Sequence, residues 1–247
     1  MAISPRVLGA WLLGLCFACA GACAQTLRLA HDQNFPPFAE AAAGQSRGLA
    51  IDLVEAAARK AGLTLQFVPV PFEQMQRTLE DGRADAIFPV AINAQRRDTM
   101  DFGSALLMSG GALFVRAPAA TPTDLAWLQG KTVVTPKTGP LAGFIAKQVP
   151  GARLVVTADY DESLARLMSG EADAAALNMQ VGAMLAAQRY PGQITPADRL
   201  FLELPLAAAT AKGRGRLLEP LDEAMAQLRA DGTWQSIIDR WAASWRR

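Results

Sequence analysis

Cysteine is missing from most of this sequence, as are histidine clusters, long apolar runs and any marked excess of charge. All three cysteines lie within the first 24 of the 247 residues, at Cys16, Cys19 and Cys23. The remainder of the chain therefore has no means of forming an internal disulfide. His31 is the only histidine, so we expect no metal site and no cofactor. Such a fold depends on its hydrophobic core, which a 51% hydrophobic composition can supply.

The first 24 residues have the pattern of a secretory signal peptide. One cation, Arg6, precedes an apolar stretch over residues 7–20, and Ala22-Cys23-Ala24 offers the small residues of a cleavage site. The stretch is shorter than the roughly 20 residues that span a membrane. An alternative is lipid attachment at Cys23, which the preceding Ala-Gly-Ala favours less. We expect cleavage after Ala24 and export to the periplasm.

The balance of charge excludes some partners. The chain has 24 Lys and Arg against 23 Asp and Glu, and loss of Arg6 with the leader leaves 23 of each. A mature chain of 223 residues (247 minus 24) without net charge gives no reason to expect nucleic acid or an anionic membrane as a partner. Its length suits one large domain or two small ones.

Short β-type runs alternate with longer helical patterns along the chain. Leu49, Leu53, Val54 and Ala57 recur at helical spacing, and Gly62 follows as a helix-ending residue. The predicted strands cover residues 26–30, 63–70, 84–88, 131–135, 152–156 and 172–177. The predicted helices cover residues 49–61, 72–80, 141–148, 160–168 and 181–189, and the helical pattern returns from residue 213 to the end. This alternation predicts an α/β fold with largely parallel sheets.

One phrase occurs twice in the sequence. A helix end, a glycine and Ala84-Asp85-Ala86 return 88 residues later at Ala172-Asp173-Ala174. A period this long predicts two similar α/β lobes whose strand ends face one crevice, where open α/β sheets bind ligands. The alternative is that units of helix, glycine and strand simply recur in α/β proteins. Only the first copy continues into a pair of arginines, Arg96 and Arg97.

Two further stretches predict how the lobes are connected. Residues 116–124 are rich in proline, alanine and threonine and are typical of a connection that leaves the first lobe. Residues 200–210 provide the return. We therefore expect a first lobe of residues 25–116 and 204–247, a second lobe of residues 117–203, and two crossovers that form a hinge.

Five motifs in order resemble the bacterial extracellular solute-binding proteins of family 3, which include the polar amino-acid receptors of ABC importers. The opening strand is similar at LRLAHDQNFPPF and the first helix at RGLAIDLVEAAARKAGL. The likeness continues through GRADAIFPVAINAQRRDTMDF, LQGKTVVTPKTGP and DGTWQSIIDRW, so it spans nearly all of the mature chain. The resemblance implies the two-lobed periplasmic binding protein fold of type II, with a mostly parallel sheet flanked by helices in each lobe.

The resemblance also implies a function and a partner. Such proteins close two lobes on a small ligand, usually without chemistry. We therefore expect a monomeric periplasmic receptor, not an enzyme, that traps a small polar or carboxylate-bearing ligand such as an amino acid or a related organic acid. The expected partner is an ABC permease of the inner membrane.

Arg96 is the residue that we expect to bind a ligand carboxylate. A guanidinium group meets a carboxylate through two charge-assisted hydrogen bonds. Asn93 can cap a short helix and place Arg96 in its first turn, beside free backbone N–H groups that also favour an anion. The resemblance assigns the role to Arg96 rather than Arg97. The alternative is that both are solvated surface arginines.

Other ligand-binding positions follow from the resemblance. Asp32 ends the first predicted strand and resembles the family's acidic contact to a ligand amino group, with a turn or capping role as the alternative. Phe35 and Phe72 are candidate walls that stack on the ligand, with core packing as the alternative. Lys137 and Thr138 resemble the second-lobe turn that meets the ligand, with a solvated loop as the alternative.

Two residues near these positions are expected to pack instead. Phe38 fits the core better than the site, and His31 fits packing of the first strand.

Asn178 is a departure from the family pattern. At this strand end the amino-acid receptors usually carry an aspartate that pairs with the ligand's α-ammonium group. An amide offers no net negative charge, and loss of a charged partner costs roughly 1.5–3 kcal/mol. The change favours a carboxylate or another polar solute over an ordinary α-amino acid, unless Asp32 or Glu203 supplies the missing charge.

Two other functions are compatible with this scaffold. Some relatives resemble cyclohexadienyl dehydratases acting on arogenate or similar rings, and such chemistry needs a general acid in the cleft. Glu40, Glu73 and Glu171 are the carboxylates nearest the candidate site loops, although none lies in a motif. A loaded receptor could also signal to a membrane sensor instead of feeding an importer.

Overall fold

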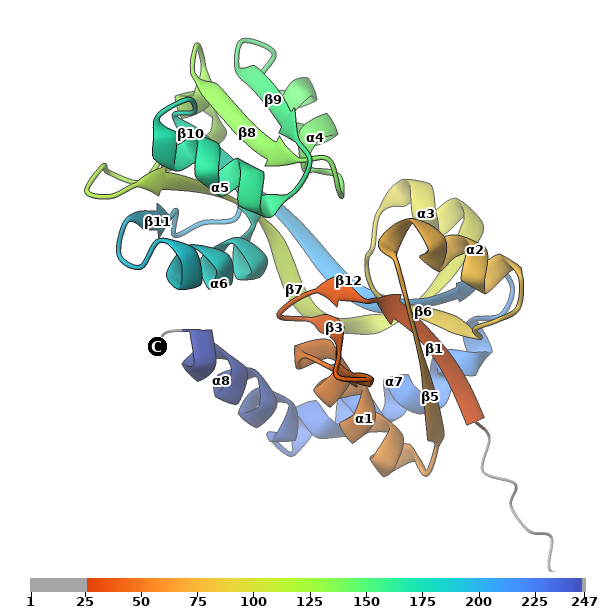
Figure 1. Cartoon of the computed structure of the whole chain (residues 1–247). Helices are drawn as coiled ribbons and strands as arrows, with labels where there is room; N and C mark the ends of the chain where they lie inside the picture. Colours follow the sequence, from red (N-terminus) through yellow and green to blue (C-terminus); the bar gives the residue numbers. More distant parts are fainter. Residues whose placement is uncertain (1–25, 246–247) are drawn as a thin grey trace, which may run out of the picture.

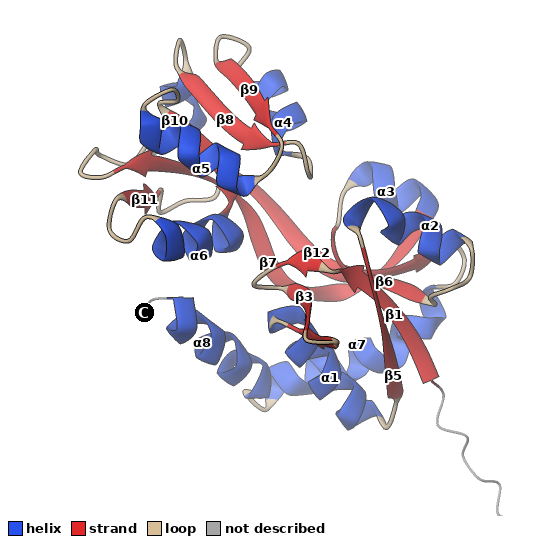
Figure 2. Cartoon of the chain, in the orientation of Figure 1, coloured by secondary structure: helices blue, strands red, loops and turns tan. Residues whose placement is uncertain are grey.

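Two lobes of similar build are joined by two long strands (Figures 1 and 2). The computed structural model describes residues 26–245, so the expected signal peptide lies outside the described residues. The strands are β1 (Thr26–Asp32), β2 (Asn34–Phe35), β3 (Ala39–Ala42), β4 (Gln45–Arg47), β5 (Thr64–Val70), β6 (Ala86–Ala91), β7 (Met100–Arg116), β8 (Thr132–Pro136), β9 (Arg153–Thr157), β10 (Ala174–Asn178), β11 (Ile194–Pro196) and β12 (Leu202–Ala211). The helices are α1 (Leu49–Ala61), α2 (Met75–Glu80), α3 (Ala94–Thr99), α4 (Leu141–Gln148), α5 (Tyr160–Ser169), α6 (Met179–Arg189), α7 (Glu219–Ala230) and α8 (Thr233–Trp245), and short 3-10 helices cover Phe72–Gln74, Leu125–Leu128 and Gly215–Leu218.

A hydrogen-bonded sheet of nine strands runs through both lobes in the order β5-β1-β6-β12-β7-β10-β8-β9, with β11 paired to β7. β1 is parallel to β5 and β6 in the first lobe, and β8 is parallel to β9 and β10 in the second. β7 and β12 are antiparallel to their neighbours. A small second sheet has the order β2-β3-β4. The predicted α/β fold is therefore confirmed, with parallel pairing inside each lobe and antiparallel pairing at the junction.

β7 and β12 carry the chain between the lobes. The first part of β7 pairs with β12, and its last part pairs with β10 and β11 of the second lobe. The connection expected at residues 116–124 begins beyond the crossing, because Arg116 already pairs with Ile194 in the second lobe. The reason is that residues 100–116 form one uninterrupted strand. We propose that the outward crossing lies near Gly110, which pairs with Glu203 of the returning strand.

Two glycines allow close approach at this crossing. A Cβ atom on Gly110 would lie 2.2 Å from the carbonyl oxygen of Leu202, and one on Gly111 would lie 2.5 Å from the ring of Phe201. Side-chain carbons do not approach other atoms this closely. Gly110 therefore requires glycine, as strands do where another backbone comes near, whereas a side chain at position 111 would require the Phe201 and Leu141 side chains to shift.

The repeated phrase has the same local structure in both lobes. In each copy a helix is followed by a glycine with positive φ and then by a strand. The carboxylate of Asp85 accepts the backbone N–H of Arg28 at 2.9 Å, and that of Asp173 accepts the N–H of Thr132 at 2.8 Å. The backbone N–H of Asp85 also donates to the carbonyl oxygen of Arg28, and that of Asp173 donates to the carbonyl oxygen of Thr132. The two aspartates thus fasten β6 and β10 to their parallel neighbours.

α1 shows how the sequence builds the first lobe. Gly48 precedes the helix with φ of +138°, and a Cβ atom there would lie 2.3 Å from a backbone oxygen. Gly62 ends the helix in the left-handed conformation, as predicted. Asp52 accepts a hydrogen bond from Trp241 Nε1 at 2.9 Å and so fastens α8 onto α1.

The hydrophobic core covers both faces of the sheet in each lobe. Neighbouring strand residues divide between the faces, so Phe88 packs with α1 and α7 while Ile87 packs with α2. In the second lobe Phe114 packs toward α5 and α6, and Leu113 packs toward α4. Burial of such side chains contributes about 1.5–3 kcal/mol each, which holds the lobes without crosslinks.

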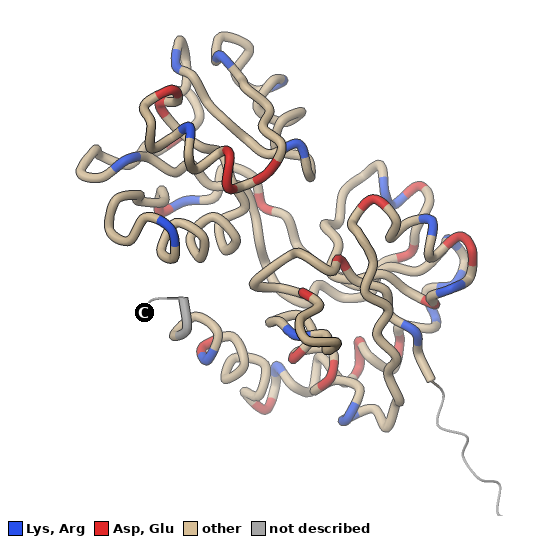
Figure 3. Tube along the Cα trace, viewed as in Figure 1, with Lys and Arg blue, Asp and Glu red and all other residues tan. Residues whose placement is uncertain are grey.

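Charged residues of both signs are spread over both lobes (Figure 3). Within residues 26–245, no helix combines the length and the apolar character that crossing a membrane requires.

His31 is fully buried at the end of β1, in the packing role expected for it. Its Nδ1 lies 2.8 Å from the carbonyl oxygen of Asp32 and donates to it. Nε2 then accepts from the Ser46 hydroxyl at 2.6 Å, which ties the small sheet to β1. The ring also makes edge contacts with Phe67 and Phe88. Burial lowers the pKa of His31, although its bond to the Asp32 backbone opposes the shift.

This lowered pKa predicts acid sensitivity. Below the ordinary pKa of 6.5 the unfolded chain takes up a proton that folded His31 resists, so its stabilisation is complete above that pH and declines below it. We expect the free energy of unfolding to fall between about pH 6.5 and pH 5, and the non-titrating variant His31→Gln to lose part of this dependence. Urea denaturation at each pH measures both. Equal pH slopes in the two proteins would contradict the prediction.

Candidate functional site

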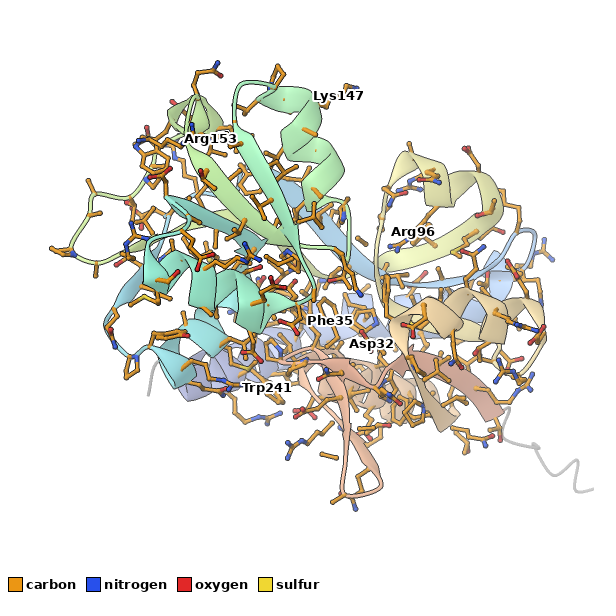
Figure 4. The ribbon with its side chains drawn as sticks, turned by 45° about the horizontal axis from the view of Figure 1, so that its top comes forward. Asp32, Phe35, Arg96, Lys147, Arg153 and Trp241 are labelled. Atoms are coloured by element: carbon orange, nitrogen blue, oxygen red, sulfur yellow. The ribbon has the colours of Figure 1, made fainter. Side chains whose placement is uncertain are left out.

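A cavity of about 220 Å³ lies between the lobes. Its volume suits a small solute rather than a polymer. The ends of β1, β6 and β10 open into it, which is where α/β sheets bind ligands. The lining residues are Asp32, Asn34, Phe35, Phe72, Pro89, Val90, Ala91 and Arg96 from the first lobe, Thr138, Gly139, Pro140, Leu141, Ala158, Asp159, Tyr160 and Asn178 from the second, and Leu204 and Leu206 from β12. In Figure 4 the labelled Asp32, Phe35 and Arg96 lie on the side of the first lobe that faces the second.

Arg96 provides a positive charge in the cavity wall. Asn93 caps α3 as expected, because its side chain accepts the backbone N–H of Arg96 at 2.8 Å. The guanidinium donates to the carbonyl oxygen of Ala91 at 3.0 Å, and no carboxylate of the described residues pairs with it. Burial lowers the pKa of Arg96. A half-buried cation without a counter-ion favours an anion in the cavity.

Arg97 points elsewhere. Its side chain is exposed, and its guanidinium lies 5.8 Å from the ring centroid of Phe102. It does not line the cavity.

Asp32 provides a carboxylate at the end of β1. Its Oδ1 accepts the backbone N–H of Asn34 at 2.9 Å, so it also stabilises a turn. Burial raises the pKa of Asp32, the negative charge of Glu73 raises it further, and the bond from Asn34 opposes both. A cationic group in the cavity would stabilise the ionised carboxylate and reverse this shift.

The aromatic residues divide between the cavity wall and the core. Phe35 and Phe72 line the cavity, and Phe72 is 37% exposed. Phe38 is fully buried, with its ring centroid 5.0 Å from that of Phe35. Phe38 therefore supports the wall from behind.

The second-lobe turn meets the cavity through some of its residues only. Thr138 and Gly139 line it, whereas Lys137 is exposed and does not. Asn93 likewise reaches the cavity only indirectly, through the helix that it caps.

Asn178 has a structural role that the sequence interpretation does not include. It is 8% exposed, and its Oδ1 accepts the backbone N–H groups of Gln180 and Val181 at 3.1 and 3.2 Å, which caps α6. Its Nδ2 donates to the buried Ser109 hydroxyl of β7 at 2.6 Å. One amide hydrogen is left for the cavity. Glu203, the other candidate for the missing charge, does not line the cavity.

Asp159 and Tyr160 line the cavity, although the sequence interpretation assigns neither of them. Asp159 caps α5 by accepting the N–H of Glu162 at 2.8 Å, and the carboxylate of Glu162 accepts the N–H of Ala158, the residue before the cap, at 2.7 Å. The spacing Asp-x-x-Glu is the visible signal of this capping box. Burial raises the pKa of Tyr160, and the backbone of Asn178 acts in the opposite direction.

The carboxylates considered for catalysis lie outside the cavity. Glu40 forms an ion pair with Arg47 at 2.7 Å, Glu73 is exposed, and Glu171 accepts a bond from Ser169 at 3.1 Å. No three His, Cys, Asp or Glu side chains gather to hold a metal ion in the part of the chain that the structure describes. The arrangement is suited to binding a small molecule with charged groups.

The fold and the cavity between lobes define a two-lobed binding protein of the periplasmic type II class. The family model of the bacterial extracellular solute-binding proteins, family 3, matches residues 27–244. The chain therefore belongs to this family, which confirms the resemblance seen in its motifs.

Several known proteins are similar over most of their length. The L-cystine-binding protein TcyJ of Escherichia coli (strain K12) is 22% identical over 219 residues, which cover 87% of this chain and 82% of that protein. The histidine-binding periplasmic protein of Salmonella typhimurium is 25% identical over 234 residues, covering 88% and 87%. The structure of an ancestral arginine-binding protein bound to glutamine is 27% identical with a TM-score of 0.72, covering 87% and 97%. The ancestral amino acid-binding protein AncCDT-1, a precursor of cyclohexadienyl dehydratase, is 25% identical with a TM-score of 0.72, covering 87% and 94%.

The contacts of Asn178 predict a measurable contribution to stability. Asn178→Ala removes a helix cap and the bond to Ser109, so we expect the ligand-free protein to lose about 1–2 kcal/mol of unfolding free energy. Urea denaturation measures the loss. Gln188→Ala, on the exposed end of α6, serves as the control and should change stability by less than about 0.5 kcal/mol. An unchanged midpoint for Asn178→Ala would show that these contacts do not stabilise the fold.

Proposed function

We propose that this protein is a periplasmic receptor that traps a small carboxylate-bearing solute, an amino acid or a related organic acid, between its lobes. The guanidinium of Arg96 carries the proposal, because it is half-buried in the cavity wall and has no carboxylate partner among the described residues. A ligand carboxylate would supply that partner through charge-assisted hydrogen bonds. The similarity to proteins named for the binding of cystine and histidine supports the same class of ligand.

Contacts from both lobes would couple binding to closure. Arg96 and Asp32 approach the ligand from the first lobe, and Thr138 and Asn178 approach it from the second. A ligand that touches both sets stabilises the closed arrangement over the open one. β7 and β12 are the connections that would bend. Lys137 and Asn93 do not line the cavity, so they would not contact the ligand directly.

The partner in this proposal is an ABC permease of the inner membrane, which receives the ligand from the closed monomer. Relatives named as periplasmic binding proteins support this place of action. Signalling by the loaded receptor to a membrane sensor is the other use of such a receptor.

A second candidate function is an enzyme on the same scaffold. The observation that favours it is the raised pKa of Asp32, since acids and bases that act in catalysis often have shifted pKa values. The similarity to AncCDT-1 adds support. Against it, Glu40, Glu73 and Glu171 all lie outside the cavity. Burial of an acid that awaits a cationic ligand group accounts for the same shift, so we propose binding rather than catalysis.

A thermal-shift screen tests the binding proposal. The screen covers amino acids, amines, dicarboxylates and sugar acids, and a ligand at 100 times its Kd stabilises the fold by about 2.7 kcal/mol. We expect the stabilising compounds to carry a free carboxylate, and their carboxamide analogues to be inactive. For the best compound, Arg96→Ala should raise the Kd at least tenfold by calorimetry, which is about 1.4 kcal/mol. Arg97→Ala is the matched control and should leave the Kd unchanged. An unchanged Kd for Arg96→Ala would remove Arg96 from the site.

Incubation with arogenate or prephenate separates the two functions. We expect no formation of phenylalanine or phenylpyruvate above the uncatalysed rate, because the carboxylates considered for catalysis, Glu40, Glu73 and Glu171, do not line the cavity. Chromatography of the reaction mixture measures both products. Product formed by the wild type and abolished in Asp32→Asn would establish an enzyme instead.

A further inference from the structure

The charged residues of the cavity wall are unequally divided between the lobes. Arg96 and Asp32 belong to the first lobe. Of the lining residues that the second lobe contributes, Asp159 alone carries a charge. A ligand that bridges the lobes therefore meets one fixed charge on the second lobe, and this charge is negative.

Asp159 has a carboxylate oxygen to offer. Its Oδ1 accepts the N–H of Glu162 at the start of α5. Its Oδ2 has no hydrogen bond or ion pair with the described residues, and the side chain is exposed to the cavity. Asp161, two residues further on, is instead paired with Arg189 at 3.2 Å.

Asn178 is unable to provide the same interaction. Its carbonyl oxygen already accepts two backbone N–H groups of α6, and its amide donates to Ser109. What remains is a donor, and a donor repels an ammonium or guanidinium group of a ligand. Another side chain of the second lobe must therefore accept a hydrogen bond from a cationic group of the ligand.

We propose that Asp159 is the second-lobe residue that pairs with a cationic group of the ligand, while Arg96 holds its carboxylate. This inference rests on the proposed function and narrows its ligand class. A zwitterionic ligand leaves Arg96 and Asp159 each with an opposite charge, and Asp32 shares the cation from the first lobe. A dicarboxylate would bring a second anion toward two carboxylates, which is unfavourable.

The position of Asp159 also predicts the orientation of the ligand in the cavity. A second cavity of about 450 Å³ adjoins the first and shares Asn34, Phe35, Asp159 and Tyr160 with it. The cation is therefore held at the end of the site that faces this second cavity. A long amine- or guanidine-bearing side chain finds room there.

Calorimetry with L-arginine, L-histidine, L-glutamine and succinate tests the inference on wild type and Asp159→Asn. Asparagine caps helices as well as aspartate does, so the variant removes the charge and keeps the start of α5. We expect the wild type to bind one of the three amino acids more tightly than succinate. Asp159→Asn should raise the Kd for that amine-bearing probe at least tenfold and should not raise the Kd for succinate. Asp159→Ser, also a good cap, should behave in the same way. Asp198→Asn, which changes an exposed second-lobe carboxylate that lines neither cavity, is the matched control and should stay within twofold of wild type.

The outcomes distinguish this inference from the function on which it rests. A preference of the wild type for succinate, or equal affinity of Asp159→Asn and wild type for the amine-bearing probe, overturns the role of Asp159. If Arg96→Ala weakens the same probe while Asp159→Asn does not, the binding site stands and only the role of Asp159 fails. If neither variant weakens it, the cavity is not the binding site and both proposals fail.

Discussion

The antiparallel pairing of β7 with β12 is the interaction on which the rest of the structure depends. These two strands carry the chain from one lobe to the other, and Val181 of α6 also packs in the core of the first lobe. The backbone of Leu202 leaves no room for a side chain at Gly110, where the two strands pair. Leu204 and Leu206 of β12 line the cavity, so the connection between the lobes is also part of the site. A change in the relative position of the lobes therefore also changes the shape of the cavity.

Much of this fold could be predicted from local patterns, and the exceptions have a common cause. α1 and α4 have the predicted bounds because their apolar spacing and their ends are encoded within a few residues. The strand over residues 100–116 is absent from the predicted set. Its adjacent glycines, Gly110 and Gly111, resemble loop punctuation, and its β12 partners lie about 90 to 110 residues away in the sequence. Pairing at such a distance leaves no local pattern to read.

The candidate site shows the same division. Arg96, Asp32 and Thr138 could be located because motifs mark them, and each lines the cavity. Asn178 was identifiable as a departure, but its capping of α6 and its bond to Ser109 emerge only when β7 is placed beside it. Asp159 carries a capping signal in the sequence, and nothing local shows that the same side chain borders a cavity. Local sequence patterns identify candidate site residues, and tertiary packing determines which of them line the cavity.

The topology of the crossing has a consequence for how such receptors diversify. At the proposed crossing the outgoing and returning strands pair directly, Gly110 with Glu203 and Gly111 with Leu202. An inserted unit whose two ends meet at one place can be exchanged between relatives, provided that the contact of Val181 with the core of the first lobe is kept. A single recombination event would then carry Asp159, Asn178 and Thr138 together into another receptor. The second-lobe contacts to a ligand would be inherited together, whereas the first-lobe contacts, including those of Arg96, would not be transferred.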